Sequence, residues 1–118
     1  MLNFISKFFR VKQKEVEAKL LPTNLCTFGG VGEVEIETWS GGIVKLEASL
    51  KHSGLPDGAM ISVLLSGQQI LSFQLSGGYA KKHIQSTEGY NIPDIAVGEI
   101  AEMQYNSQVL YRGPFRPD

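Results

Sequence analysis

The sequence predicts an all-β protein: a single antiparallel β-sandwich of about eight short strands, preceded by a short N-terminal amphipathic helix. Residues 30–113 contain short runs in which apolar and polar residues alternate, as in strands with one buried face. Glycine-centred turns separate these runs. The first residues instead repeat their apolar side chains at helical spacing. We therefore expect a helical appendage at residues 1–12 and one β-sandwich domain at residues 14–115.

Composition favours one ordinary globular domain. The chain has 118 residues, 42% of them hydrophobic and 19% charged, with a formal net charge of −1. A chain of this length buries enough surface for a single core. The charge balance gives no reason to expect nucleic acid as a partner. The longest apolar runs span only a few residues, whereas a transmembrane helix needs about 20.

The N-terminal residues 2–11 are expected to form the helix. Its apolar face consists of Leu2, Phe4, Ile5, Phe8 and Phe9. The opposite face carries the basic residues Lys7, Arg10 and Lys14. Three uses stay open: the helix covers an end of the sandwich, docks on a partner protein or another subunit, or enters an anionic membrane surface shallowly. Because the segment is short and carries few cations, membrane contact would be weak.

From Glu15 the apolar period changes from helical spacing to two. The alternation continues to Pro22, which predicts a first strand. Residues 32–39 and 43–52 then form a predicted hairpin around a Ser-Gly-Gly turn. In both strands the even-numbered apolar residues are expected to face the core, and the odd-numbered charged residues to face solvent.

Three glutamates, Glu33, Glu35 and Glu37, occupy alternate positions on the outward face of this hairpin. Carboxylates are calcium and magnesium ligands, but alternate strand residues lie about 7 Å apart and no Asp-rich loop completes a coordination shell. Lys45 and Lys51 lie on the neighbouring strand. We therefore predict cross-strand charge pairing here, and no metal site.

The second half of the domain continues with strands and turns. A Pro-Asp-Gly turn marks the loop at residues 53–58. Strands are expected at residues 60–66, 69–76, 79–86, 100–105 and 108–112. The first three of these should form a meander, and the last two a closing hairpin, with Gly113-Pro114 ending the sheet. A longer connection at residues 87–98 separates the two groups.

A few reactive side chains need an interpretation. The register of residues 79–86 points Lys82 inward, and we interpret it as a charge near a sheet edge that discourages aggregation, with its ammonium reaching solvent. His52 and His83 are the only histidines and are expected to face solvent. Cys26 is the only cysteine, so no intrachain disulfide forms, and we expect it to be a small buried residue.

Several segments carry a resemblance to known domains. Residues 32–36, 44–50, 54–58 and 110–115 resemble a loosely defined group of uncharacterised bacterial all-β domains. Those domains are distantly similar to the Greek-key sandwiches of copper/zinc superoxide dismutase and the CHRD module. The resemblance covers roughly residues 14–115 and implies a sandwich fold. In the dismutase the strand after the 54–58 turn carries a His-x-His metal pair, whereas residues 60–64 here contain no histidine.

The predicted function is therefore non-catalytic, because no nucleophile, base and orienting group occur together. We expect a structural or protein-interaction module that self-assembles or docks on a protein partner through its N-terminal helix or an edge strand. The alternative is a module that binds a small ligand, a carbohydrate or a membrane surface through the loops 53–58 and 87–98, with Tyr90 and Asp94. No cofactor is expected. No secretory signal is recognised at the N-terminus, so a cytoplasmic location is expected.

Overall fold

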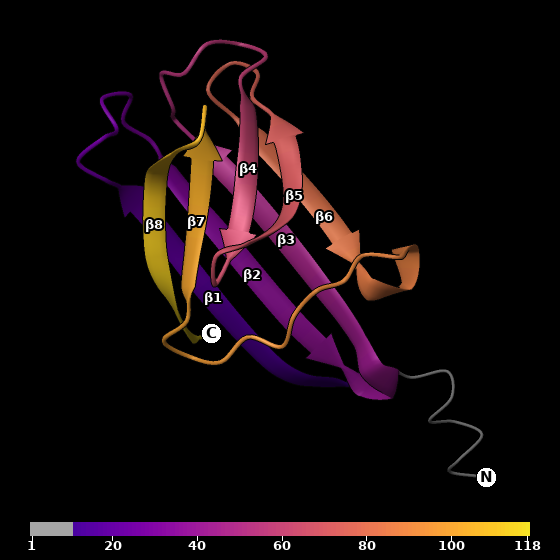
Figure 1. The fold of residues 1–118 in the computed structure, drawn as a ribbon. Helices are drawn as coiled ribbons and strands as arrows, with labels where there is room; N and C mark the ends of the chain where they lie inside the picture. Colours follow the sequence, from indigo (N-terminus) through magenta and orange to yellow (C-terminus); the bar gives the residue numbers. More distant parts are fainter. Residues whose placement is uncertain (1–10) are drawn as a thin grey trace, which may run out of the picture.

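The computed structural model describes residues 11–118, which form one antiparallel sheet of eight strands curled into a nearly closed barrel (Figure 1). The strand order is β5-β4-β7-β8-β1-β2-β3-β6. The strands are β1 (Lys12–Pro22), β2 (Val31–Trp39), β3 (Ile43–Lys51), β4 (Met60–Leu65), β5 (Gln68–Gln74), β6 (Ala80–Gln85), β7 (Ile100–Tyr105) and β8 (Gln108–Pro117).

Strand β8 makes the sheet continuous, because it pairs with β7 on one edge and with β1 on the other. Its ladder with β1 is interrupted opposite Gly113 and Pro114. A side chain on Gly113 would overlap the backbone carbonyl of Lys19, so only glycine permits this close approach. The predicted two-layer sandwich is therefore wrong: one strand bends through both halves of a single barrel-like sheet. Gly113-Pro114 lies inside β8 and does not end the sheet.

The helix in the predicted fold class is also corrected. Residues 11–118 contain no α-helix, only two single 3-10 turns, η1 (Ser40–Gly42) and η2 (Ser86–Glu88). Lys12, the last residue of the expected appendage, already belongs to β1. The proposed docking residues Leu2, Phe4, Ile5, Phe8 and Phe9 lie outside the described residues.

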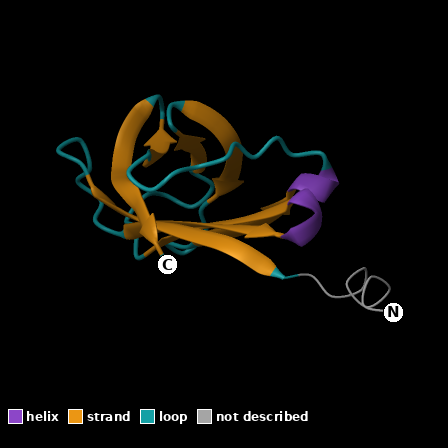
Figure 2. Cartoon of the chain, turned by 90° about the horizontal axis from the view of Figure 1, so that it is seen from below, coloured by secondary structure: helices purple, strands orange, loops and turns teal. Residues whose placement is uncertain are grey.

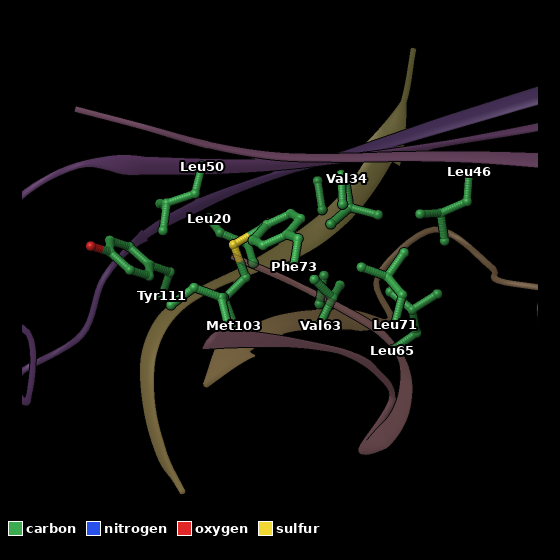
Figure 3. Close-up of a cluster of buried hydrophobic side chains, with 14 of the residues drawn as sticks. Leu20, Val34, Leu46, Leu50, Val63, Leu65, Leu71, Phe73, Met103 and Tyr111 are labelled. Atoms are coloured by element: carbon green, nitrogen blue, oxygen red, sulfur yellow. The ribbon is translucent and has the colours of Figure 1, made fainter. Parts of the chain in front are cut away.

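The core lies inside the curl of the sheet. Figure 3 shows Val34 and Leu46 from one half of the sheet facing Val63, Leu65 and Leu71 from the other. The largest fully buried side chains are Tyr111, Phe115, Leu20, Leu46, Leu50, Ile61, Leu65, Leu75, Ile84, Met103, Leu110 and Val34. The inward register predicted for β2 and β3 is confirmed, because their even-numbered apolar residues face this core, and in β1 Val16, Ala18 and Leu20 do the same.

The path after β5 differs from the predicted meander. β4 and β5 form a hairpin, but β6 crosses to the opposite end of the strand order and pairs with β3. Between β5 and β6, where the meander predicts a hairpin, the structure has a single isolated bridge from Ser76 to Tyr79. The predicted closing hairpin of β7 and β8 is confirmed, with Asn106 and Ser107 both at positive φ in its turn.

Candidate functional site

The lower end of the barrel, in the orientation of Figure 1, contains a pocket that the loop at residues 87–98 covers. The first residues of β1 extend past the end of β8, because Val16 is the first β1 residue to pair with that strand. Residues 87–98 run back over the inner face of these projecting strands (Figure 2). Ile95 anchors this cover with only 3% of its surface exposed, and Tyr90 and Ile92 also pack against the core.

Beneath this cover lies a pocket of about 240 Å³. Its lining is Lys14, Val16, Ile36, Thr38, Val44, Ile92, Pro93, Asp94 and Ile95. The Nζ atom of Lys14 donates a hydrogen bond of 2.8 Å to the carbonyl oxygen of Ile95 and lies 3.4 Å from Asp94 Oδ1. The pocket is therefore mainly apolar, with one ion pair joining strand β1 to the covering loop.

The two loops of the predicted ligand site, 53–58 and 87–98, lie apart in the structure. Ser53 donates from its backbone to Gly78, next to the start of β6, whereas Val44 donates to the Ser86 side chain at the other end of that strand. Loops 53–58 and 87–98 therefore lie at opposite ends of the barrel (Figure 1). Asp94 reaches the pocket with its side chain 94% exposed, while the residues lining the pocket do not include Tyr90.

A second candidate site is the seam between β5 and β6, the two ends of the strand order. Among residues 11–118, no strand pairs with the outer edge of either one beyond the Ser76–Tyr79 bridge. Lys82, on β6, points inward as predicted, and its Nζ donates 3.3 Å across the seam to the carbonyl oxygen of Ser72 on β5. The ammonium thus binds an edge carbonyl, although we expected it to reach solvent.

The backbone of β5 presents its groups alternately to β4 and to this seam. Leu75 donates to the Ala59 carbonyl, which fixes the side of the strand that faces β4. In an antiparallel ladder the orientation alternates, so Phe73 also faces β4 while Ser72 and Gln74 face the open edge. The hydrogen bond that Ser72 accepts from Lys82 agrees with this orientation.

The outer surface of β1, β2 and β3 carries a row of carboxylates. The register places Glu17 opposite Glu35, and Glu35 opposite Glu47. Burial, together with the neighbouring charges of Glu15, Asp118 and Glu37, raises the pKa of Glu35 to about 7. Burial also raises the pKa of Glu17. Glutamates brought together on one sheet face therefore oppose each other's ionisation.

The cations that neutralise this surface are not those predicted. Lys12 contacts Glu15 at 2.9 Å and Glu37 at 3.7 Å, and Lys81 contacts Glu47 at 3.1 Å. Lys45 instead lies over the Trp39 ring, 4.8 Å from its centroid. Within residues 11–118, neither Lys45 nor Lys51 forms an ion pair with the glutamates of β2.

Among residues 11–118, one cluster of three carboxylates could share a cation. Side-chain oxygens of Glu15, Glu35 and Asp118 lie within 4.8 Å of one another. Of the three outward glutamates of β2 weighed as cation ligands, Glu33, Glu35 and Glu37, only Glu35 belongs to this group. Glu15 already binds Lys12, which lowers the pKa of Glu15. Exposed carboxylates of this kind are common on sheet surfaces, so the group does not indicate a metal.

The remaining reactive residues do not line the pocket. His52 and His83 are exposed, as expected. Cys26 is only half-buried, and its Sγ lies 3.8 Å from the Gly29 carbonyl oxygen, so the expectation of a buried cysteine is wrong. Comparison with protein-family models gives no match, and comparison with curated proteins gives none either. Across residues 11–118, no helix has the length and apolar character to span a bilayer.

Sequence reasoning missed Lys14 as a pocket residue. The expected helix and strand met near this position, and Lys14 was assigned to the polar face of the helix. In the structure it occupies an inward position in β1, opposite Thr38. The sequence did contain a signal for this position. Because strand side chains alternate between faces, extending the alternation of Val16, Ala18 and Leu20 back by two residues places Lys14 on the inner face.

Proposed function

We propose that this chain is a non-catalytic protein-interaction module that associates with a second copy of itself through the open edges of β5 and β6. The supporting observation is that the sheet curls without closing, so that two edges with unpaired backbone groups face each other. An unpaired edge is a template for an added strand. The chain is expected to work in the cytoplasm.

The composition of the two edges favours selective rather than general pairing. The β6 edge carries Lys81 and Lys82, and inward-pointing or edge lysines discourage unspecific strand addition. The β5 edge is uncharged over its length. A strand that adds at β5 must replace the single hydrogen bond from Lys82 to Ser72, and it gains main-chain hydrogen bonds along the strand.

The substitution Ser72→Pro in the full chain tests edge pairing. Proline removes a backbone N–H that faces the open edge and does not bond to β4, so the β4–β5 ladder keeps its hydrogen bonds. We expect the wild-type chain to show a mass above the monomer value of 13.0 kDa in light scattering at rising protein concentration. The Ser72→Pro protein should remain at the monomer mass.

The matched control is Ser72→Ala, which removes the same hydroxyl but keeps the edge N–H, and which should associate like the wild type. Circular dichroism checks that both variants keep the β-fold. A wild-type chain that stays monomeric at every concentration would contradict the proposal. Unchanged association of a folded Ser72→Pro protein would contradict it as well.

A second candidate function is the binding of a small apolar ligand, and the covered pocket at the lower end favours it. Mouths of barrels are frequent ligand sites, although a volume of about 240 Å³ is below the usual range for drug-sized ligands. A short acyl chain with a carboxylate suits the pocket, because its apolar part contacts Val16 and Val44 and its charge faces Lys14.

Titration of the full chain with hexanoate tests this second function. We expect amide chemical-shift changes in NMR spectra at Thr38, Val44 and Ile95, and several-fold weaker binding by Lys14→Gln. Hexylamine, which has a similar chain and the opposite charge, serves as the control ligand and should bind less well. Shift changes that are absent from these residues, or spread evenly over the surface, would exclude the pocket as the binding site.

A further inference from the structure

The chain enters its first strand beside the pocket. Val11, the first described residue, accepts a backbone hydrogen bond of 2.8 Å from Ser40 and donates one of 3.0 Å to the Ser40 side chain. Ser40 lies between Thr38 and Val44, which both line the pocket. Ten residues precede Val11. They therefore join the fold at the end of the barrel where the pocket lies.

The chemistry of those ten residues matches the pocket. They include three phenylalanines, at positions 4, 8 and 9, together with Lys7, Arg10 and no acidic residue. The pocket wall is mainly apolar, and its rim carries the exposed carboxylate of Asp94. A volume of about 240 Å³ suits one aromatic side chain better than a cofactor.

The length of the chain is also sufficient. Lys14 lines the pocket, and Phe8 precedes it by six residues. An extended chain spans about 3.3–3.6 Å per residue, so Phe8 and Phe9 reach the pocket with slack and Phe4 has a still wider reach. A short tether also gives a high effective concentration, on the order of millimolar, so a weak contact is enough for occupancy.

We propose that a phenylalanine from residues 1–10 of the same chain occupies the lower pocket and that any external ligand must displace it. The inference concerns the same pocket as the second candidate function, and it requires only that this pocket accept an apolar group. It does not depend on pairing at β5 and β6.

Disulfide trapping in the full chain tests the proposal. In a Cys26→Ser background, Phe4, Phe8 or Phe9 is replaced one at a time by cysteine and combined with Thr38→Cys, which lies in the pocket. We expect at least one pair to form an intramolecular disulfide under mild oxidation, seen as a monomer on a non-reducing gel with loss of both free thiols by mass spectrometry.

The matched control replaces Glu37 instead of Thr38. These neighbours on β2 are equally close to the N-terminus along the fold, but their side chains point to opposite faces of the sheet. Trapping at least tenfold faster at Thr38 than at Glu37 supports occupancy of the pocket. Equal rates at both positions would reflect tethering alone and overturn the proposal. Disulfides that form only between chains would also overturn it, because the occupant would then be a second copy.

Hexanoate separates this inference from the ligand function. The full-length variant with all three phenylalanines replaced by serine should bind hexanoate about tenfold more tightly than the wild type, because the competitor is lost. Equal affinity of the two proteins, with shift changes at Thr38 and Val44 in both, would overturn pocket occupancy by the chain and leave the ligand function standing.

Discussion

Tyr111 joins the loop that follows β1 and the loop that follows β3 to the core. Its hydroxyl donates a 2.6 Å hydrogen bond to the Gly29 carbonyl and lies 2.9 Å from Ser53 Oγ. Ser53 Oγ in turn accepts from the Leu55 backbone N–H. Burial of the ring raises the pKa of Tyr111 to about 12, so the hydroxyl keeps its proton and acts as a donor. One side chain thus connects two loops that are far apart in the sequence.

Replacing Tyr111 by phenylalanine should lower the free energy of unfolding by about 1–3 kcal/mol, because buried polar partners lose their hydrogen bond. Chemical denaturation of the full chain measures this loss. The exposed Tyr79 provides the control, since Tyr79→Phe should change stability by less than about 0.5 kcal/mol. Equal effects of the two substitutions would show that the Tyr111 hydroxyl contributes little.

At the scale of elements, the pairing of β1, β2 and β3 determines how the outer surface titrates. Glu35 lies on the central strand of this group, where burial is the largest cause of its raised pKa and the neighbouring carboxylates of Glu15, Asp118 and Glu37 add to it. Its pKa of about 7 is above the ordinary value of 4.5, so the folded protein holds this proton more tightly than the unfolded chain does. The resulting stabilisation is complete below about pH 4.5 and is lost as the pH rises through 7.

The variant Glu35→Gln should therefore be more stable than the wild type at pH 8, and the difference should shrink toward pH 5. Solvent screening of this partly exposed group limits the gain to about 1 kcal/mol. Thermal or denaturant unfolding across this pH range checks the slope. Glu47→Gln is the control, because Glu47 has its own partner, Lys81, and its removal should give no gain at pH 8. A wild-type stability that rises between pH 5 and pH 8 relative to Glu35→Gln would contradict the assignment.

Strand β8 illustrates how far an element can be predicted from its residues. Its alternation up to Arg112 was recognised, but Gly113-Pro114 was interpreted as a stop. The same two residues instead permit a close crossing over Lys19, after which β8 continues to Pro117. A bulge near Gln104 also turns both Leu110 and Tyr111 into the core, which strict alternation does not predict. Turn-forming residues look alike in a sequence whether a strand ends or bends.

At the scale of the whole molecule, the strands were predictable and their order was not. Alternation reports which face of a strand is buried, and it located seven of the eight strands to within three residues of their ends, whereas β8 continues five residues further than predicted. It contains no information about which strand lies alongside, so β6 was expected beside β5 although it pairs with β3. The covered pocket depends on that arrangement, because the 87–98 loop must return from β6 to β7 across the barrel end. Asp94 was predicted as a ligand-site residue because it lies in this long loop. Its partner Lys14 lies on β1, and the sequence does not show that β1 and the loop meet.

The pairing of the first and last strands has a mechanical consequence. β1 and β8 are antiparallel, and Val16 lies opposite Pro117, so the start of one and the end of the other are neighbours at the same end of the barrel. A force that pulls β1 and β8 apart at this end would load the hydrogen bonds between them one at a time. The first is the bond from the Asp118 N–H to the Glu15 carbonyl oxygen. Tension applied through β1 and β8 would thus act on these hydrogen bonds in sequence and begin to separate the strand that unites the sheet.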